Sequence, residues 1–457
     1  MLFSSIPFLY YFLPLAISAY FLTPKRFKNV TLLLFSLAFY AWGEPRLVVL
    51  MLVSVAVGYI AGLVMEHCRF KKTTLFVSVA IVLSFLLYFK YADFFISNIN
   101  AVTGLSLPLL KLALPIGISF YTFQILSYIV DVYRGEPAQK DPIKLATFIS
   151  LFPQLIAGPI VRYSDISREL TERKHSLSLA ASGITRFMTG LGKKILIANT
   201  LGELCTAFSQ STSPSVAFVW LNAIAYALQI YFDFSGYSDM AIGIGRVFGF
   251  NFLENFNYPF ISASITEFWR RWHMSLGSWF RDYVYIPMGG NRVSKPRFLF
   301  NILVVWMLTG FWHGADWNFI IWGVFFAVFL IIEKLFLKRF LDHHRPIGHI
   351  YTLLLVLISF AIFASTDFSA VLFSLSGMFG FSGLPAVTPE TIYYFKNYGT
   401  LLVVAAVGAT PLMKNICKRL PDSVKTVLEP VFSVVMLILC TAFLADGSFN
   451  PFLYFRF

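Results

Sequence analysis

A histidine in the middle of the chain has the surroundings of a group that could move protons. His313 stands in LTGFWHGADWNF, between two short apolar segments and beside Trp312 and Gly314. An ionisable side chain in such a place is costly to bury and is therefore a candidate functional group. Imidazole, with an unperturbed pKa of about 6.5, can take and return a proton at neutral pH. A general base acting on a hydroxyl is one interpretation of His313, and a buried structural histidine is the other.

A second histidine lies among arginines in TEFWRRWHMSLGSWFRDYVYIPMGGNR, residues 266–292. On one continuous helix, Arg270, His273, Gly277 and Arg281 would share a face, because their spacings are three, four and four. One interpretation of this stripe is a cationic wall for an anionic donor, with His273 turned toward the reaction centre. An amphipathic helix lying among lipid headgroups, with solvated arginines, explains the same pattern. The Gly-Gly pair that follows predicts a turn.

Carboxylates occur within a third apolar stretch, YALQIYFDFSGYSDMAIGIG, which begins at Tyr226. Asp233 and Asp239 would be expensive at membrane depth and must face a cavity or a partner. One interpretation is that the Ser-Gly pair breaks a helix and the two acids bind the freed amides. The other is that the polar side chains line a substrate cavity.

The elements that position these groups are membrane-spanning helices. Apolar residues make up 58% of the chain and charged residues 13%, and the mean hydropathy is +0.72. A hydrocarbon core about 30 Å thick needs roughly 20 apolar residues of helix. We expect an all-α integral membrane protein with about eleven transmembrane helices, and re-entrant or interfacial helices between them. Stretches of suitable length lie at 5–22, 46–65, 73–89, 112–132, 215–232, 316–333, 350–364, 399–413 and 430–445.

The distribution of basic residues predicts the topology. Lysines and arginines cluster after the first and third spans and again around 414–425, and positive loops stay in the cytoplasm. Both termini are therefore expected outside, with the last span ending at Asp446. The net charge of +13 is explained by this topology and by contact with anionic membrane lipids, so no nucleic acid partner is expected.

Neither a metal site nor a separate soluble domain is predicted. The four cysteines have no CxxC spacing, and His343-His344 has no third ligand at a suitable distance. We expect one membrane-embedded domain over residues 1–457, with residues 446–457 as an extracellular aromatic tail. The absence of an internal repeat counts against a transporter, whose folds often carry one.

Several motifs resemble the membrane-bound O-acyltransferase (MBOAT) family. They are the run from Tyr231 to Gly243, FWRRWHMSLGSWFRDYVYIPMGG, GFWHGADWNFIIWG, and PQLIAGPIVRY at 153–163. The chain is most similar to the bacterial branch that contains the alginate and peptidoglycan O-acetyltransferases. The resemblance implies helices around a central funnel. It also implies that His313 is the family's catalytic histidine and His273 its second active-site histidine.

The resemblance further implies what is transferred. Acetyl-CoA, a cytosolic thioester, would be the donor substrate, with no bound cofactor. Arg270 and Arg281 would bind it. The acceptor would be a hydroxyl of a cell-envelope polysaccharide outside the bacterial cytoplasmic membrane, reached with a periplasmic or extracellular acetyltransferase as partner. His273, Asn318 or a backbone amide near Gly314 could stabilise the oxyanion.

The chain ends in GSFNPFLYFRF, an expected external tail. An interfacial aromatic anchor is the simple interpretation. FLYFRF also resembles a C-terminal motif of this bacterial branch, whose tyrosine is proposed to carry the acyl group. A phenol with a pKa of about 10 is close to a thiol at about 8.5, so an acyl-Tyr454 would keep most of the thioester's transfer potential.

Three other functions compete with acetyl transfer. D-alanyl transfer to teichoic acid uses related chemistry. A lipid or small-molecule transporter shares the hydropathy and the intramembrane ionisable groups. A scaffold that recruits an extracellular transferase would need no chemistry of its own. Release of free CoA from acetyl-CoA separates an acetyltransferase from the last two.

Overall fold

The computed structural model describes residues 2–446 and 450–451, and these form helices without a β-strand. The expected all-α architecture is confirmed for this part of the chain. The backbone divides into two compact units, each treated by itself below. Unit 1 comprises Met1–Phe187 and Ser238–Leu253, and unit 2 comprises Met188–Tyr237 and Glu254–Phe457. The single domain over 1–457 and the central funnel stay predictions.

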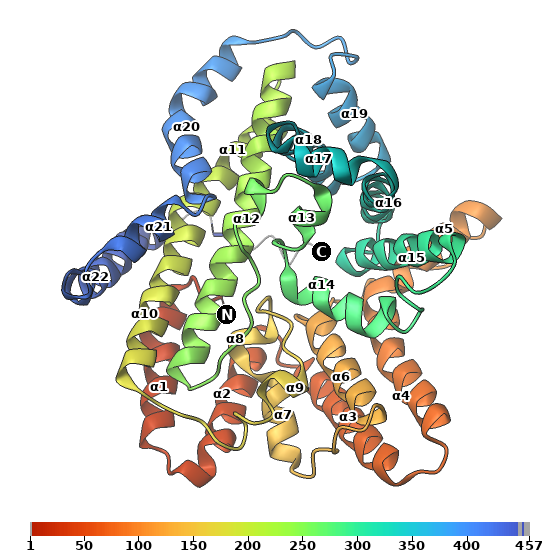
Figure 1. Cartoon of the computed structure of the whole chain (residues 1–457), viewed down its shortest axis with the longest axis vertical. Coiled ribbons are helices and arrows are strands. Elements are labelled where there is room, and N and C mark those ends of the chain that lie inside the picture. The colour runs from red at the N-terminus through yellow and green to blue at the C-terminus, as the bar shows by residue number, and fades with distance from the viewer. Residues whose placement is uncertain (1, 447–449, 452–457) are drawn as a thin grey trace. The chain divides into compact units, whose positions relative to one another are not determined.

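Unit 1 is built around closely packed apolar helices. In Figure 1, α3, α4 and α6 lie side by side, and α2 packs on α7. The close approach of α3 and α6 depends on Gly58 and Gly62, one turn apart in a GxxxG pattern. A Cβ at Gly58 would lie 3.0 Å from Ile125, and one at Gly62 would overlap the Tyr128 ring. The helices are α1 (Leu13–Leu22), α2 (Lys28–Gly43), α3 (Val48–His67), α4 (Lys71–Leu86), α5 (Ala92–Thr103), α6 (Ile118–Tyr133), α7 (Pro142–Ser150), α8 (Phe152–Leu155) and α9 (Tyr163–Ile166).

Unit 2 contains the segments with candidate chemistry. The most extensive contact between two of its helices is that of α15 with α16, which are neighbours in Figure 1. Gly310 and Gly323 allow this contact, because a Cβ on either would overlap a backbone carbonyl of the other helix. The helices are α11 (Thr200–Ser209), α13 (Ile265–Trp269), α14 (Met274–Phe280), α15 (Lys295–His313), α16 (Trp317–Ile332), α17 (Lys338–His343), α18 (Arg345–Ala364), α19 (Phe368–Met378), α20 (Pro389–Gly408), α21 (Leu412–Arg419) and α22 (Asp422–Asp446).

Two helices contribute residues to both units: α10 (Leu177–Gly192), which continues as the π-helical η4 (Lys193–Asn199), and α12 (Val216–Val247). The expected break of α12 at Ser235-Gly236 is wrong, because the helix runs through. Gly236 instead admits a neighbour, since its Cβ would lie 2.7 Å from the carbonyl oxygen of Gly190.

The acids of α12 bind cations rather than loose amides. Asp233 pairs with Lys194 at 2.6 Å, with both side chains below 5% exposure, and Asp239 pairs with Arg186 at 2.8 Å. A carboxylate among apolar side chains needs such a partner. The cations on α10 and η4 are partners that the sequence did not identify, and the interpretation that the polar side chains of this stretch line a substrate cavity stays a prediction.

Six helices of the described residues are long and apolar enough to cross a membrane. A seventh span results if α20 and α21, which meet at a 62° bend, count as one. The prediction of about eleven crossings stays a prediction, since shorter apolar helices such as Phe8–Leu22 also exist. The six are Val48–His67, Lys71–Thr103, Val216–Val247, Trp317–His343, Arg345–Ala364 and Asp422–Asp446.

Candidate functional site

The predicted continuous helix through residues 270–281 is wrong, because the chain breaks at His273. That residue has φ 43° and ψ 53°, in the left-handed region. Such a conformation costs a non-glycine residue about 1–3 kcal/mol and needs support from its surroundings. The support comes from the preceding loop: the Met274 N–H donates to the Asn255 carbonyl, and the Asn257 N–H donates to the Arg271 carbonyl, both at 2.9 Å.

The side chain of Asn255 also fixes the imidazole. Its Oδ1 accepts from the Ser275 hydroxyl at 2.9 Å and from the Ser275 N–H at 3.3 Å. Because a backbone N–H can only donate, the oxygen of the amide must face this way. The third contact of Oδ1, 3.1 Å to His273 Nδ1, therefore requires a proton on Nδ1. In a neutral His273, Nε2 then carries no proton and can only accept a hydrogen bond.

His273 is held in this neutral form. Its side chain is 1% exposed, and the Phe234 ring lies edge-on with 4.6 Å between centroids. Burial, followed by the charge of His313, lowers the pKa of His273 well below its ordinary value. His273 is consequently suited to accept a hydrogen bond, and poorly suited to donate one from Nε2 to an oxyanion.

His313 is the last residue of α15 and is also buried. Its ring is enclosed by Trp322 and Phe363, with centroids 5.1 and 5.4 Å away. Trp312 connects the two candidate residues, since its ring centroid lies 5.0 Å from that of His313 and 6.0 Å from that of His273. The fold thus brings together two histidines that are 40 residues apart in the sequence (313 minus 273).

A cavity of about 530 Å³ opens beside His273. Although their helix is broken, all four members of the predicted stripe line it, as do Thr266, Trp269, Tyr285, Asn291, Trp306 and Lys334 among others. On α15 its wall follows Ile302, Trp306 and Thr309. The next position on that face is His313, four residues after Thr309 and one helical turn beyond the lining.

Three cations surround this cavity. Arg281 is 62% exposed and pairs with Asp282 at 2.6 Å, and Arg270 is exposed. Lys334, which the sequence analysis missed, places its Nζ 4.9 Å from the Phe298 ring and 5.8 Å from the Tyr285 ring. An ammonium held over aromatic faces remains available to an anion. A lysine placed directly after a long apolar run was the available signal.

A buried acid fixes the start of the helix that carries Arg270. Glu333, 0% exposed, accepts from the N–H groups of Ile265 and Thr266 at 2.5 and 2.8 Å, and from the Thr266 hydroxyl at 2.7 Å. A carboxylate at a helix N-terminus satisfies free donors and favours the helix dipole. Glu333 and Asn255 were both missed, because their partners are 67 and 18 residues away.

Other predicted groups fall outside this constellation. The amide of Asn318 donates to the carbonyls of Phe363 and Ser365, at 3.4 and 2.7 Å, so both hydrogens tie α16 to the end of α18. Asn318 therefore loses support as an oxyanion donor. The Gly289-Gly290 turn is confirmed, with positive φ at both residues. Tyr454 lies outside the described residues. Within residues 2–446 and 450–451, no cluster of three His, Cys, Asp or Glu could hold a metal.

Comparisons with known proteins agree with these motifs. A model of the membrane-bound O-acyltransferase family matches residues 21–344, which include both histidines and the cationic cavity. The probable alginate O-acetylase AlgI of Pseudomonas putida is 37% identical over 100% of both chains. The peptidoglycan O-acetyltransferase of Helicobacter pylori is 33% identical over 84% of this chain and 81% of its own. The teichoic acid D-alanyltransferase of Bacillus subtilis is 32% identical over 49% of this chain and 60% of its own.

Proposed function

The chain belongs to the membrane-bound O-acyltransferase family and is therefore a multi-pass membrane acyltransferase, and from this premise we propose that it acetylates a cell-envelope polysaccharide. Acetyl-CoA is the proposed donor, and a sugar hydroxyl outside the bacterial cytoplasmic membrane is the acceptor. Relatives named for O-acetylation match over four-fifths of the chain or more, whereas the D-alanyltransferase matches over about half. This difference favours acetyl over D-alanyl.

The observation that carries the proposal is the cationic cavity that leads toward His313. Its volume is within the ~300–1,000 Å³ range of small-molecule sites. Arg270, Arg281 and Lys334 offer positive charge to the phosphates of CoA. Trp269 and Trp306 offer an apolar wall to its pantetheine arm. The thioester would then reach the end of the cavity nearest His313.

The charge distribution supports access from the cytosol. Basic residues precede α15 and follow α16, so the positive-inside rule assigns both of these loops to the cytoplasm. Lys334 lies at that end, whereas His313 lies at the opposite end of the α15–α16 hairpin. The donor would enter where the cations are and meet the acceptor near the turn. The basic residues are Arg292 before α15, Lys295 and Arg297 in its first turn, and Lys334, Lys338, Arg339 and Arg345 after α16.

Each histidine has a role that its surroundings support. His313 takes the proton of the attacking hydroxyl as its oxygen bonds to the thioester carbonyl, and returns that proton to the departing CoA sulfur. His273 accepts a hydrogen bond from the hydroxyl at its unprotonated Nε2 and so orients the hydroxyl. The oxyanion requires a donor, and a backbone amide near Gly314 suits this better than His273 or Asn318.

Transfer to the outside uses Tyr454 as a relay in this proposal. The Tyr454 oxygen attacks the acetyl thioester, giving an acetyl-tyrosine ester and free CoA. A polysaccharide hydroxyl then displaces the phenol with the help of a periplasmic or extracellular acetyltransferase, and Tyr454 is restored. The support is the FLYFRF motif and the leaving-group ability of a phenol.

The experiment is turnover by the purified chain. Incubated with acetyl-CoA in lipid nanodiscs, the protein should release free CoA, and mass spectrometry should find one acetyl group on Tyr454. A transporter or a scaffold would release none. Turnover with a D-alanyl thioester in place of acetyl-CoA would instead favour the teichoic-acid alternative.

A further inference from the structure

The buried ion pair of unit 2 has a further partner from the end of the chain. Lys194 is 2% exposed on η4, and its Nζ contacts the Asp233 carboxylate on α12 at 2.6 Å. The same Nζ donates a hydrogen bond to the carbonyl oxygen of Pro451. One turn or so further along η4, the Asn199 amide nitrogen lies 3.3 Å from the Asn450 side-chain oxygen. Two successive tail residues are therefore held by two polar groups of η4.

A buried ion pair is a poor way to gain stability. Taking two charges out of water costs free energy that their attraction does not always recover, and apolar residues of similar volume often serve as well. A buried ammonium is useful, however, for holding a carbonyl oxygen that must enter an apolar region. A hydrogen bond from a charged donor is also stronger than one between neutral groups.

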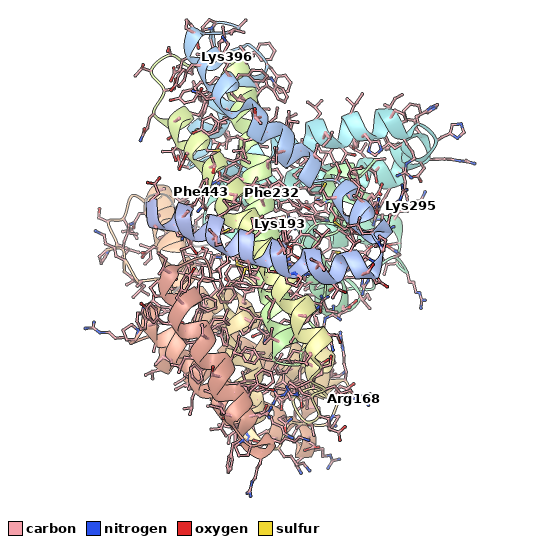
Figure 2. All side chains as sticks on the ribbon, turned by 90° about the vertical axis from the view of Figure 1, so that its left-hand side faces the viewer. Arg168, Lys193, Phe232, Lys295, Lys396 and Phe443 are labelled. Atoms are coloured by element: carbon pink, nitrogen blue, oxygen red, sulfur yellow. The ribbon has the colours of Figure 1, made fainter. Side chains whose placement is uncertain are left out.

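We propose that Lys194, Asp233 and Asn199 form a docking site for the C-terminal tail of this same chain. Asp233 forms an ion pair with Lys194 and orients its ammonium group. Lys194 donates a hydrogen bond to the Pro451 carbonyl, and Asn199 donates one to the side-chain oxygen of Asn450. The packing of the last helix supports the arrangement, because α22 contacts η4 and crosses the region of Lys193 in Figure 2.

The docking site and the reaction site are linked through two consecutive residues of α12. Asp233 immediately precedes Phe234, whose ring contacts His273. Tyr454 is three positions after Pro451 in the sequence, and three extended residues reach at most ~10 Å. A tail held at Asn450 and Pro451 would keep Tyr454 within that distance of the docking site and raise its effective concentration there. This consequence rests on the proposed relay, whereas the docking itself does not.

Proximity of the tail can be tested by thiol cross-linking in the full chain. The four native cysteines are replaced by alanine, and Asn199→Cys is combined with Asn450→Cys. A protease site placed in the turn before α21 then separates the fragment with residue 199 from the fragment with residue 450. A short bifunctional thiol reagent should keep the fragments joined. In chains with only one of the new cysteines, the two fragments should separate after proteolysis.

Removal of the ammonium should release the tail. Lys194→Met is expected to lower the cross-linked fraction about tenfold, the effect of one charged hydrogen bond. Lys194→Met with Asp233→Asn avoids leaving a buried charge alone and should give the same result in a chain that elutes normally from a sizing column. Lys193→Met, on the neighbouring half-buried residue, is the matched control and should cross-link like the parent.

The outcomes separate the docking site from the proposed function. Absence of cross-linking in the parent, or equal cross-linking in the double variant, would overturn the docking site even if the chain released CoA from acetyl-CoA. Cross-linking that depends on Lys194 would support it even if acetyl-CoA were not turned over, in which case the relay would fail alone.

Discussion

Asn255 decides which nitrogen of His273 carries the proton, because its side-chain oxygen contacts the imidazole and also accepts from Ser275. The sequence indicated both histidines by their chemistry and by family resemblance. Asn255 could not be predicted, because an asparagine in a loop has many ordinary roles and only the folded chain brings it to His273. Glu333 was hidden for the same reason. Residues that would act on the substrate can be identified from a sequence more often than the residues that orient them.

Loss of this orienting oxygen should reduce acyl transfer. Asn255→Ala leaves Nδ1 without its acceptor and lets the ring change tautomer, so kcat for CoA release should fall roughly 10²-fold, within the range of proton-transfer contributions. Asn255→Asp keeps the oxygen and should retain most activity at high pH. A carboxylate beside the ring also raises the pKa of His273, so activity, which needs the neutral ring, should begin at a higher pH than in the parent.

The pH dependence of kcat is the decisive measurement for the two Asn255 variants. A purely structural Asn255 would lower activity in both variants equally and leave the acidic limb of the profile in place. Parallel profiles for the parent and Asn255→Asp would therefore contradict the orienting role.

His313→Ala should abolish acyl transfer while the protein still inserts and purifies. The loss of a general base predicts a decrease of about 10²–10⁴-fold or more in polymer acetylation at matched protein levels. His67→Ala is the control, because His67 is exposed and bonds only within its own helix, to the Leu63 carbonyl. Near-normal acetylation by the His313 variant would remove His313 from the mechanism.

At the scale of elements, the helix pattern was right about a shared surface and wrong about a continuous helix. Arg270, His273, Gly277 and Arg281 do line one cavity, although the chain turns at His273. Periodicity cannot reveal a left-handed residue whose cause is a loop 18 residues earlier. Helix α12 shows the opposite error, since a Ser-Gly pair that suggested a break is a site of close packing.

The cations of the cavity should govern donor binding. Arg270→Glu, Arg281→Glu and Lys334→Glu are each expected to weaken acetyl-CoA binding by about tenfold or more, equal to ~1.4 kcal/mol. Arg292→Glu reverses an exposed charge that does not line the cavity and should change the affinity little. Calorimetry on the purified proteins measures both. If all variants bound acetyl-CoA as tightly as the parent, the alternative interpretation of residues 266–292, an amphipathic segment among lipid headgroups, would be favoured.

The packing of α12 predicts a difference between two glycines. Gly236→Ala must displace the Gly190 backbone, so the midpoint of thermal unfolding in detergent should fall by several degrees, as a loss of ~1–3 kcal/mol would produce. Gly399→Ala lies in the interior of α20 with nothing within 4 Å of the new Cβ. It should raise stability slightly, because alanine favours helix by about 1 kcal/mol. Equal effects would mean that α10 and α12 do not approach closely.

At the scale of the whole molecule, composition alone established an all-α membrane protein, and the family match agrees. The number of crossings is harder to predict, because the hydropathy of a bent or half-length helix resembles that of a full span. The 62° bend between α20 and α21 is such a case. Charge patterns remain informative, since the basic residues at the start of α15 and after α16 predict the same side of the membrane for both ends of the α15–α16 hairpin.

The predicted orientation can be checked with reporters fused to the full chain. A reporter active only outside the membrane should be active after residue 457 and inactive when placed in the basic segment 338–345. The physical reason is the cost of moving several lysines and arginines across the bilayer. A reporter that is active in that segment would place the cationic cavity on the outer side, away from cytosolic acetyl-CoA.

The ion pairs of α12 also bear on how the protein is made. Arg186 and Lys194 precede Asp239 and Asp233 in the chain, so each cation has left the ribosome before its acid. An unpaired aspartate at the centre of a span would cost roughly 2.5–3.5 kcal/mol during insertion. A nascent α12 can instead enter the bilayer beside a segment that already carries the matching charges. A fragment that starts after residue 199 should therefore insert α12 less efficiently in a coupled translation and insertion assay than one that starts before residue 177.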